Sequence, residues 1–245
     1  MSNITDEFDF GKKIVSQKDL LLFSIPVSIL FAITGMDFIG YLIYLGTRGN
    51  PTEIYTRSLL NVLLVGFLLT AVILFLIPYL VNRYRWKKPF SYFGTSLGKW
   101  KVGIAMIAVA LIISPLFYFN SQNQLLIDTY PLTKEVLVAW PIFVIYELIY
   151  VLFYYIPYEF FFRGILQLGL SKSWKKWQSI LFVTVLTTIL HITKPWIELV
   201  ASFIAGIIFG IIAEKTNSWV YVFFIHSIVG VMTDLFCGLG YLGVL

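Results

Sequence analysis

The chain has 245 residues, of which 59% are hydrophobic and 13% are charged, and its formal net charge is +5. A soluble domain of this length cannot bury so much apolar side chain, and apolar runs long enough to cross a bilayer recur along the whole sequence. The basic residues lie in short loops between these runs, where they set topology, so the net charge does not indicate nucleic-acid binding. The single cysteine, Cys237, excludes an internal disulfide and a cysteine-rich metal site.

The sequence therefore predicts an all-α fold, a polytopic transmembrane bundle of about seven or eight helices. Residues 1–18 are polar and are expected to form an N-terminal surface tail, and residues 19–245 to form a single transmembrane domain. We expect a multi-pass integral protein of a prokaryotic cell membrane with its N-terminus in the cytoplasm. Lipid is its surrounding partner.

The apolar runs give the spans in chain order. They cover about residues 19–45, 56–81, 102–119, 134–170, 177–192, 195–213 and 218–236. Asp37 lies in the first run, near its end. The run 134–170 is too long for one straight span, and Pro157 is expected to kink or divide it. Loop 82–101 carries six Lys and Arg residues and loop 120–133 carries none, so the first is expected to be cytoplasmic.

The stretch from Pro157 to Gly164 places a carboxylate and a guanidinium inside an apolar helical run. Glu159 and Arg163 are four residues apart, so they share one helical face and can meet. Because charges at bilayer depth are costly, they rarely persist there without a role. The pair is therefore either a structural ion pair that fixes helix packing or a catalytic carboxylate held by an arginine.

Helix rise places the polar residues of several spans in two neighbouring tiers. The tier nearer the cytoplasmic loops holds Arg163, His226 and Glu159, at about 10–17 Å. The deeper tier holds His191, Glu198 and Asp234, at about 24–26 Å.

A carboxylate beside an imidazole suits water activation and charge stabilisation. Zinc bound by Glu159, His191 and His226 is the alternative, although the chain has no His-Glu-x-x-His pattern, and no other cofactor is expected.

These residues resemble the CPBP (Abi) family of intramembrane proteases, which includes type II CAAX prenyl proteases and bacteriocin-processing or immunity proteins. The resemblance covers a core of about residues 90–236. The family pattern is Glu-Glu-x-x-x-Arg, then Phe-x-x-x-His, then His-x-x-x-Asn/Asp on successive helices. The resemblance implies peptide hydrolysis within the membrane by a glutamate-activated water, with the last two motifs stabilising an oxyanion. It implies catalytic roles for Glu159, Arg163, His191 and His226.

The chain departs from the family pattern at three positions. Tyr158 stands in place of the first glutamate, Thr187 in place of the phenylalanine, and Gly230 in place of the Asn/Asp. The missing glutamate is the water activator that the resemblance implies. The secondary site candidates are Tyr158, Lys194, Glu198 and Asp234.

Two classes of function follow. The first is an intramembrane endopeptidase that hydrolyses a membrane-associated peptide or protein, with Glu159, Glu198 or Asp234 as the base. The alternative is an inactive family member that acts as a membrane scaffold or immunity protein and binds a partner in the cleft. A transporter is disfavoured because the sequence shows no inverted repeat.

Overall fold

The computed structural model describes residues 14–34 and 59–245. Asp37, most of the predicted surface tail and the end of the first predicted span lie outside the described residues. The described part is helical, with no strand within it. The predicted all-α class is therefore confirmed.

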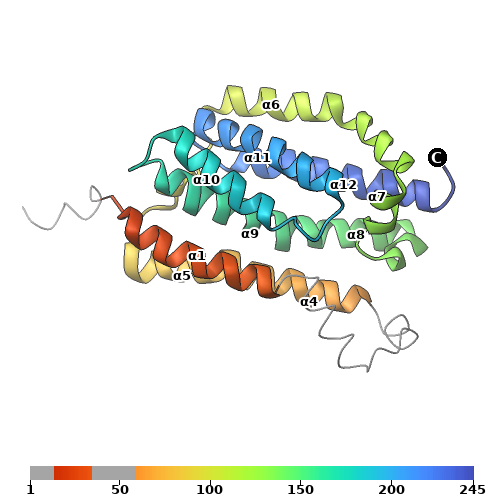
Figure 1. Cartoon of the computed structure of the whole chain (residues 1–245), viewed down its shortest axis with the longest axis horizontal. Coiled ribbons are helices and arrows are strands. Elements are labelled where there is room, and N and C mark those ends of the chain that lie inside the picture. Colours follow the sequence, from red (N-terminus) through yellow and green to blue (C-terminus); the bar gives the residue numbers. More distant parts are fainter. Residues whose placement is uncertain (1–13, 35–58) are drawn as a thin grey trace, which may run out of the picture.

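The helices run roughly along one axis and form an elongated bundle (Figure 1). At one edge lie α1 (Gln17–Thr34) and a continuous helical run made of α4 (Leu59–Ala71), η2 (Val72–Leu76), α5 (Ile77–Val81) and η3 (Asn82–Trp86). At the opposite edge lies α6 (Trp100–Ile113), which continues as η5 (Ser114–Gln122). Between the edges lie α8 (Trp140–Tyr150), η7 (Val151–Tyr155), α9 (Ile156–Glu159), η8 (Phe160–Leu168), α10 (Lys176–Ile189), α11 (Trp196–Thr216) and α12 (Val220–Tyr241). The short connecting helices are η4 (Phe90–Phe93), α7 (Gln124–Thr129) and η6 (Lys134–Val138).

Among the described residues, six helical segments are long and apolar enough to cross a membrane. They are Gln17–Thr34, Leu63–Trp86, Trp100–Gln122, Trp140–Leu168, Trp196–Thr216 and Val220–Tyr241. Helix α10 has only 14 residues and ends before the turn that carries His191. The polytopic helical bundle predicted from the sequence is thus confirmed, and the protein is an integral membrane protein.

Pro157 was expected to kink or divide the long apolar stretch, and the division is wrong. The chain stays helical from Trp140 to Leu168, and Pro157 lies in α9 directly after the π-helical turn η7. A π-helical turn is wider than an α-helical one, so it leaves room for the proline ring and does not need the missing N–H for an i→i−4 bond. The segment 134–138 instead forms the separate 3₁₀ turn η6.

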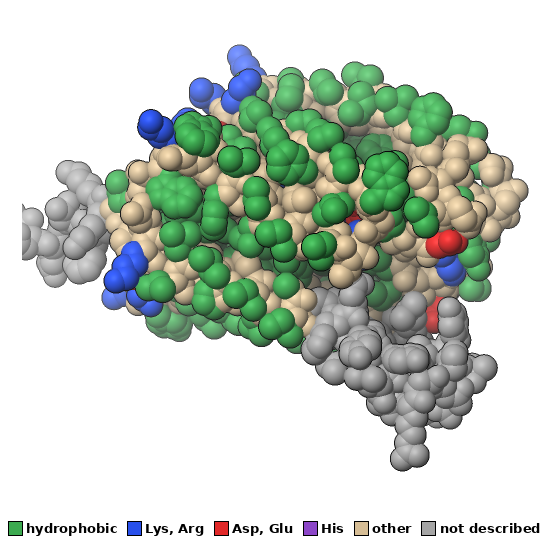
Figure 2. All heavy atoms as spheres, in the orientation of Figure 1, with side chains coloured by type: hydrophobic (Ala, Val, Ile, Leu, Met, Phe, Trp, Pro, Cys, Tyr) green, Lys and Arg blue, Asp and Glu red, His purple; other side chains and the backbone are tan. Residues whose placement is uncertain are grey.

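The motif segment lies in the middle of the bundle. Phe160, Phe161 and Phe162 are each at most 1% exposed, and they pack with aromatic side chains from α1, η2 and α12. The outer surface is covered with hydrophobic side chains, while Lys and Arg side chains gather mainly at one end (Figure 2). A lipid-facing surface and a buried polar centre are the arrangement expected for a membrane bundle with an internal site.

A candidate active site between the transmembrane helices

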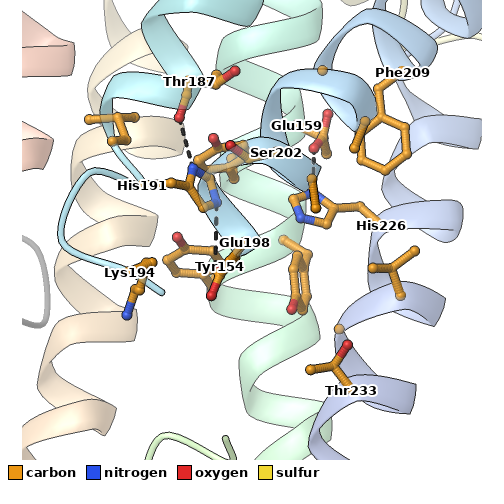
Figure 3. Close-up of a pocket in the computed structure, with 18 of the residues that line it drawn as sticks. Tyr154, Glu159, Thr187, His191, Lys194, Glu198, Ser202, Phe209, His226 and Thr233 are labelled. Carbon is orange, nitrogen blue, oxygen red and sulfur yellow. Dashed lines mark hydrogen bonds and ion pairs between the residues drawn. The ribbon is translucent and has the colours of Figure 1, made fainter. Parts of the chain in front are cut away.

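A cavity of about 710 Å³ opens between α9, the α10–α11 turn, α11 and α12. The four predicted catalytic residues line it, together with three of the four secondary candidates: Glu159, Arg163, His191, His226, Tyr158, Lys194 and Glu198. The structure therefore brings together residues from three parts of the sequence that the depth estimate had placed in adjacent tiers. In Figure 3 the two histidine rings lie on opposite sides of the cavity, each with its own carboxylate nearby.

Glu159 is the centre of one half of the site. Its side chain is 0% exposed, and Oε1 accepts a hydrogen bond from His226 Nδ1 at 2.6 Å. The Arg163 side chain is 2% exposed, and its Nε lies 3.7 Å from Glu159 Oε2. The helical spacing thus brings the two charges together as expected. A carboxylate on Nδ1 fixes the ring and leaves Nε2 of His226 as the atom able to exchange a proton.

Arg163 is held from its other side by a residue that the sequence analysis missed. Its Nη1 donates to Gln167 Oε1 at 3.0 Å, and Gln167 Nε2 donates to the Gly210 carbonyl at 2.9 Å. Gln167 is 0% exposed and follows Arg163 by four residues, so helical spacing could have identified it. The amide bridges the motif helix to α11 and fixes the guanidinium plane.

His191 and Glu198 form the other half of the site. A short turn joins the C-terminal end of α10 to the N-terminal end of α11. Here His191 Nε2 lies 4.0 Å from Glu198 Oε1. His191 Nδ1 donates to the Thr187 carbonyl at 2.8 Å, which leaves Nε2 as a lone-pair acceptor in the cavity. Glu198 lies in the first turn of α11, as the sequence predicted, and this is where the helix dipole favours a negative charge.

Tyr130 reaches this half from the segment after α7. Its hydroxyl donates to Glu198 Oε1 at 2.7 Å. Burial above all, and then the Glu198 charge, raise the pKa of Tyr130 well above its ordinary value, so the phenol stays protonated and remains a donor. Sequence reasoning missed this contact because it joins residues 68 positions apart.

Asp234 does not belong to the cavity wall. It is 1% exposed on α12 and lies close to Glu147 and Tyr146 of α8, away from the two histidines. Asp234 follows His226 by eight residues on α12, but its side chain lies against α8 and not in the cavity. Its place as a substitute base therefore has no geometric support.

The zinc alternative has no geometric support either. In residues 14–34 and 59–245, no three His, Cys, Asp or Glu side chains come together closely enough to hold a metal ion. Glu159, His191 and His226 line one cavity but belong to two separate pairs.

One comparison with known protein families matches the part of the chain that carries these residues. Residues 139–232 match the family model described as type II CAAX prenyl endopeptidase Rce1-like. This segment is an Rce1-like domain. The match is consistent with the CPBP family, and the Rce1-like domain includes both carboxylate–imidazole pairs and Arg163. Comparisons with curated proteins and with solved structures found no match.

The three departures from the family pattern, Tyr158, Thr187 and Gly230, all lie in the Rce1-like domain. Tyr158 is 3% exposed and stacks on Tyr154 with ring centroids 5.7 Å apart, so no carboxylate stands at this point of the wall. Thr187 is 4% exposed, its hydroxyl donates to the Val183 carbonyl at 2.9 Å, and its own carbonyl orients His191. Gly230 lies on α12, and a Cβ atom at this position would overlap Tyr155.

Proposed function

We propose that this protein is an intramembrane endopeptidase of the CPBP type that hydrolyses a membrane-associated peptide or protein. The observation that carries the proposal is the pairing of each cavity histidine with its own carboxylate, His191 with Glu198 and His226 with Glu159. One carboxylate–imidazole pair can serve as the acid–base group that peptide hydrolysis needs, and the other can stabilise the developing charge. The Rce1-like domain match supports the same reaction class.

Glu198 and His191 are the groups proposed to activate water. Their 4.0 Å separation is too long for a direct hydrogen bond and suits one bridging water that contacts both. Glu198 Oε2 and Glu159 Oε2 are both buried and have no hydrogen-bond partner among the described residues, so each carboxylate keeps one oxygen that can accept a proton. Glu159 is less suited to this task because His226 donates to its other oxygen and the Arg163 guanidinium lies 3.7 Å from this one.

Glu198 takes one proton from water, the water oxygen bonds to the peptide carbonyl carbon, and the carbonyl π electrons move to its oxygen. The resulting oxyanion is stabilised by donors on the facing wall, among them His226 Nε2–H when that ring is protonated. Collapse of the oxyanion breaks the C–N bond, and the amine nitrogen receives the proton that Glu198 took. The products are a carboxylic acid and an amine.

Arg163 is proposed to act through Glu159 and not on the substrate. It neutralises the Glu159 carboxylate that orients His226, and Gln167 holds it in place. Removing either partner of this buried pair would leave the other charge without compensation.

The alternative function is a catalytically inactive scaffold that binds a membrane peptide or partner protein in the cavity. The observation that favours it is Tyr158, which replaces the glutamate that the family pattern supplies for water activation. Under this alternative the histidines and carboxylates serve packing and partner recognition. Both functions place a membrane-embedded peptide in the cavity.

The experiment compares purified wild-type protein in detergent with Glu159→Ala and His226→Ala, each incubated with a panel of single-span peptides with and without a prenylated C-terminal cysteine. We expect the wild type to cleave at least one peptide, with stoichiometric new carboxyl and amino termini by mass spectrometry, and the variants to lose the cleavage. Binding of a peptide without cleavage would instead support the scaffold.

A further inference from the structure

Gly230 is the third departure from the family pattern, and the space beside it is filled by another residue. A Cβ atom placed on Gly230 would overlap the Tyr155 hydroxyl oxygen and would lie 2.5 Å from the ring carbon that bears it. The Tyr155 hydroxyl therefore stands against the α12 backbone, where the family pattern has an Asn or Asp side chain. A glycine is required at position 230 because any side chain would displace the phenol.

Tyr155 is placed on the cavity wall beside His226. The two rings have centroids 4.8 Å apart and are tilted by 59°, and both residues line the cavity. On its other side Tyr155 stacks on Tyr150 with centroids 4.8 Å apart and an interplanar angle of 26°. The phenol is 5% exposed and is held between two rings, so the position of its hydroxyl oxygen is fixed. Donors held in fixed positions at the edge of a cavity are the groups that stabilise a developing oxyanion most effectively.

We infer that Tyr155 is a catalytic residue whose hydroxyl donates a hydrogen bond to the oxyanion, in place of the Asn or Asp side chain that Gly230 lacks. The inference rests on the proposed peptidase function. In the tetrahedral intermediate the carbonyl oxygen carries the negative charge and accepts from the Tyr155 O–H and from His226. Tyr155 keeps its own proton throughout, so the step adds no further proton transfer.

The first test removes only the hydroxyl. Tyr155→Phe should keep the ring contacts and the thermal stability, and should lower kcat by about 10²- to 10³-fold with KM little changed, as expected for a lost oxyanion donor. Tyr146→Phe is the matched control, because Tyr146 is buried on the same helical run but does not line the cavity. The control should retain the wild-type kcat. A Tyr155→Phe variant that also retains wild-type kcat would overturn the inference and leave the peptidase function standing.

The second test exchanges the two positions. Gly230→Asn alone should lower thermal stability because its side chain collides with Tyr155. In the Tyr155→Ala background the asparagine has room, so Tyr155→Ala/Gly230→Asn should be more stable than Gly230→Asn and should have a higher kcat than Tyr155→Ala. A double variant that regains stability without any kcat would show a packing role only and would overturn the inference. If the wild-type protein cleaved no peptide, the peptidase function would be refuted and the inference with it. The two failures are distinguishable, because an active wild type is required for the inference to fail alone.

Discussion

His191 Nε2 and Glu198 Oε1 lie 4.0 Å apart at the ends of two helices that a short turn joins. The short turn places the two side chains at the same level of the bundle. His191 Nδ1 donates to the Thr187 carbonyl, and the Tyr130 hydroxyl donates to the same Glu198 oxygen that faces His191. No other carboxylate among the described residues shares the cavity wall with a histidine in this open arrangement, since Glu159 is engaged directly by its own partner.

Glu198→Gln should therefore remove the base while preserving the shape of the site. We expect turnover to fall by about 10²- to 10⁴-fold, the range typical of a lost general base. Glu135→Gln is the control, because Glu135 lies in η6 and does not line the cavity. The measurement is the initial rate of cleavage of the best wild-type substrate. Unchanged turnover would show that Glu198 is not the base and would favour Glu159. If the protein is a scaffold, partner binding should survive Glu198→Gln.

Tyr130→Phe should weaken the same half of the site. It keeps the ring and removes the hydrogen bond to Glu198, which is charge-assisted and contributes about 1.5–3 kcal/mol. We expect kcat to fall by about 10- to 100-fold, which is the corresponding change in rate. Tyr118→Phe, a more exposed tyrosine of η5, should have no effect. Equal rates for the two variants would show that Glu198 does not depend on the phenol.

Arg163→Ala should destabilise the fold, because it leaves the Glu159 carboxylate buried without its cation. The expected loss is about 3–5 kcal/mol in the free energy of unfolding. Arg163→Lys should rescue poorly, since an ammonium lacks the planar fork that reaches both Glu159 and Gln167. Arg85→Ala breaks an exposed ion pair with Asp19 and should cost about 0–1 kcal/mol. Unfolding in detergent compares the three, and a stable Arg163→Ala would argue that water reaches the pair.

Gln167→Leu should uncouple Arg163 from α11. The leucine fits the size of the site, but Arg163 Nη1 and the Gly210 carbonyl lose their partner, at an expected cost of about 1–3 kcal/mol. Gln17→Leu, which removes an exposed hydrogen bond from Trp174, is the control. Thermal unfolding is again the measurement. A Gln167→Leu protein as stable as the control would mean that Glu159 alone holds the guanidinium.

The topology prediction is independent of the chemistry. Loop 82–101 is expected to be cytoplasmic because of its six basic residues, and loop 120–133 to be external. The two loops lie at opposite ends of the bundle (Figure 1). Cysteines introduced at Ser96 and Gln122 in a Cys237→Ala background should react from opposite sides of the membrane. Reaction of Ser96→Cys with an impermeant reagent from outside the cell would reverse the orientation.

The sequence was sufficient to predict the helical bundle and the contacts between residues that are close along the chain. Apolar runs identify the helices, and the i,i+4 spacing of Glu159 and Arg163 alone predicts that they meet. The turn after His191 predicts that Glu198 shares its level. What the sequence could not supply are contacts between distant segments, such as Tyr130 with Glu198 or Tyr155 with Gly230, because no periodicity links them.

The passage of the helix through Pro157 also lay beyond sequence reasoning. A π-helical turn is not encoded by a distinct periodicity over so few residues, so the proline rule was applied without its main exception. Asp234 was misplaced for a related reason. Its stripe on α12 is regular, but the cavity ends before that residue, and only packing against α8 reveals this.

The shortness of α10 sets the height at which a peptide would be cut. Its 14 residues rise about 21 Å, less than the roughly 30 Å of a hydrocarbon core, so the turn that carries His191 stays below the far surface. A substrate helix standing beside α11 would present to that turn whichever bond lies at the same height. The bundle would thus set the position of cleavage by distance. Lengthening a substrate by one helical turn, at the membrane boundary on the side where α10 begins, should move the cut by about four residues, whatever the local sequence.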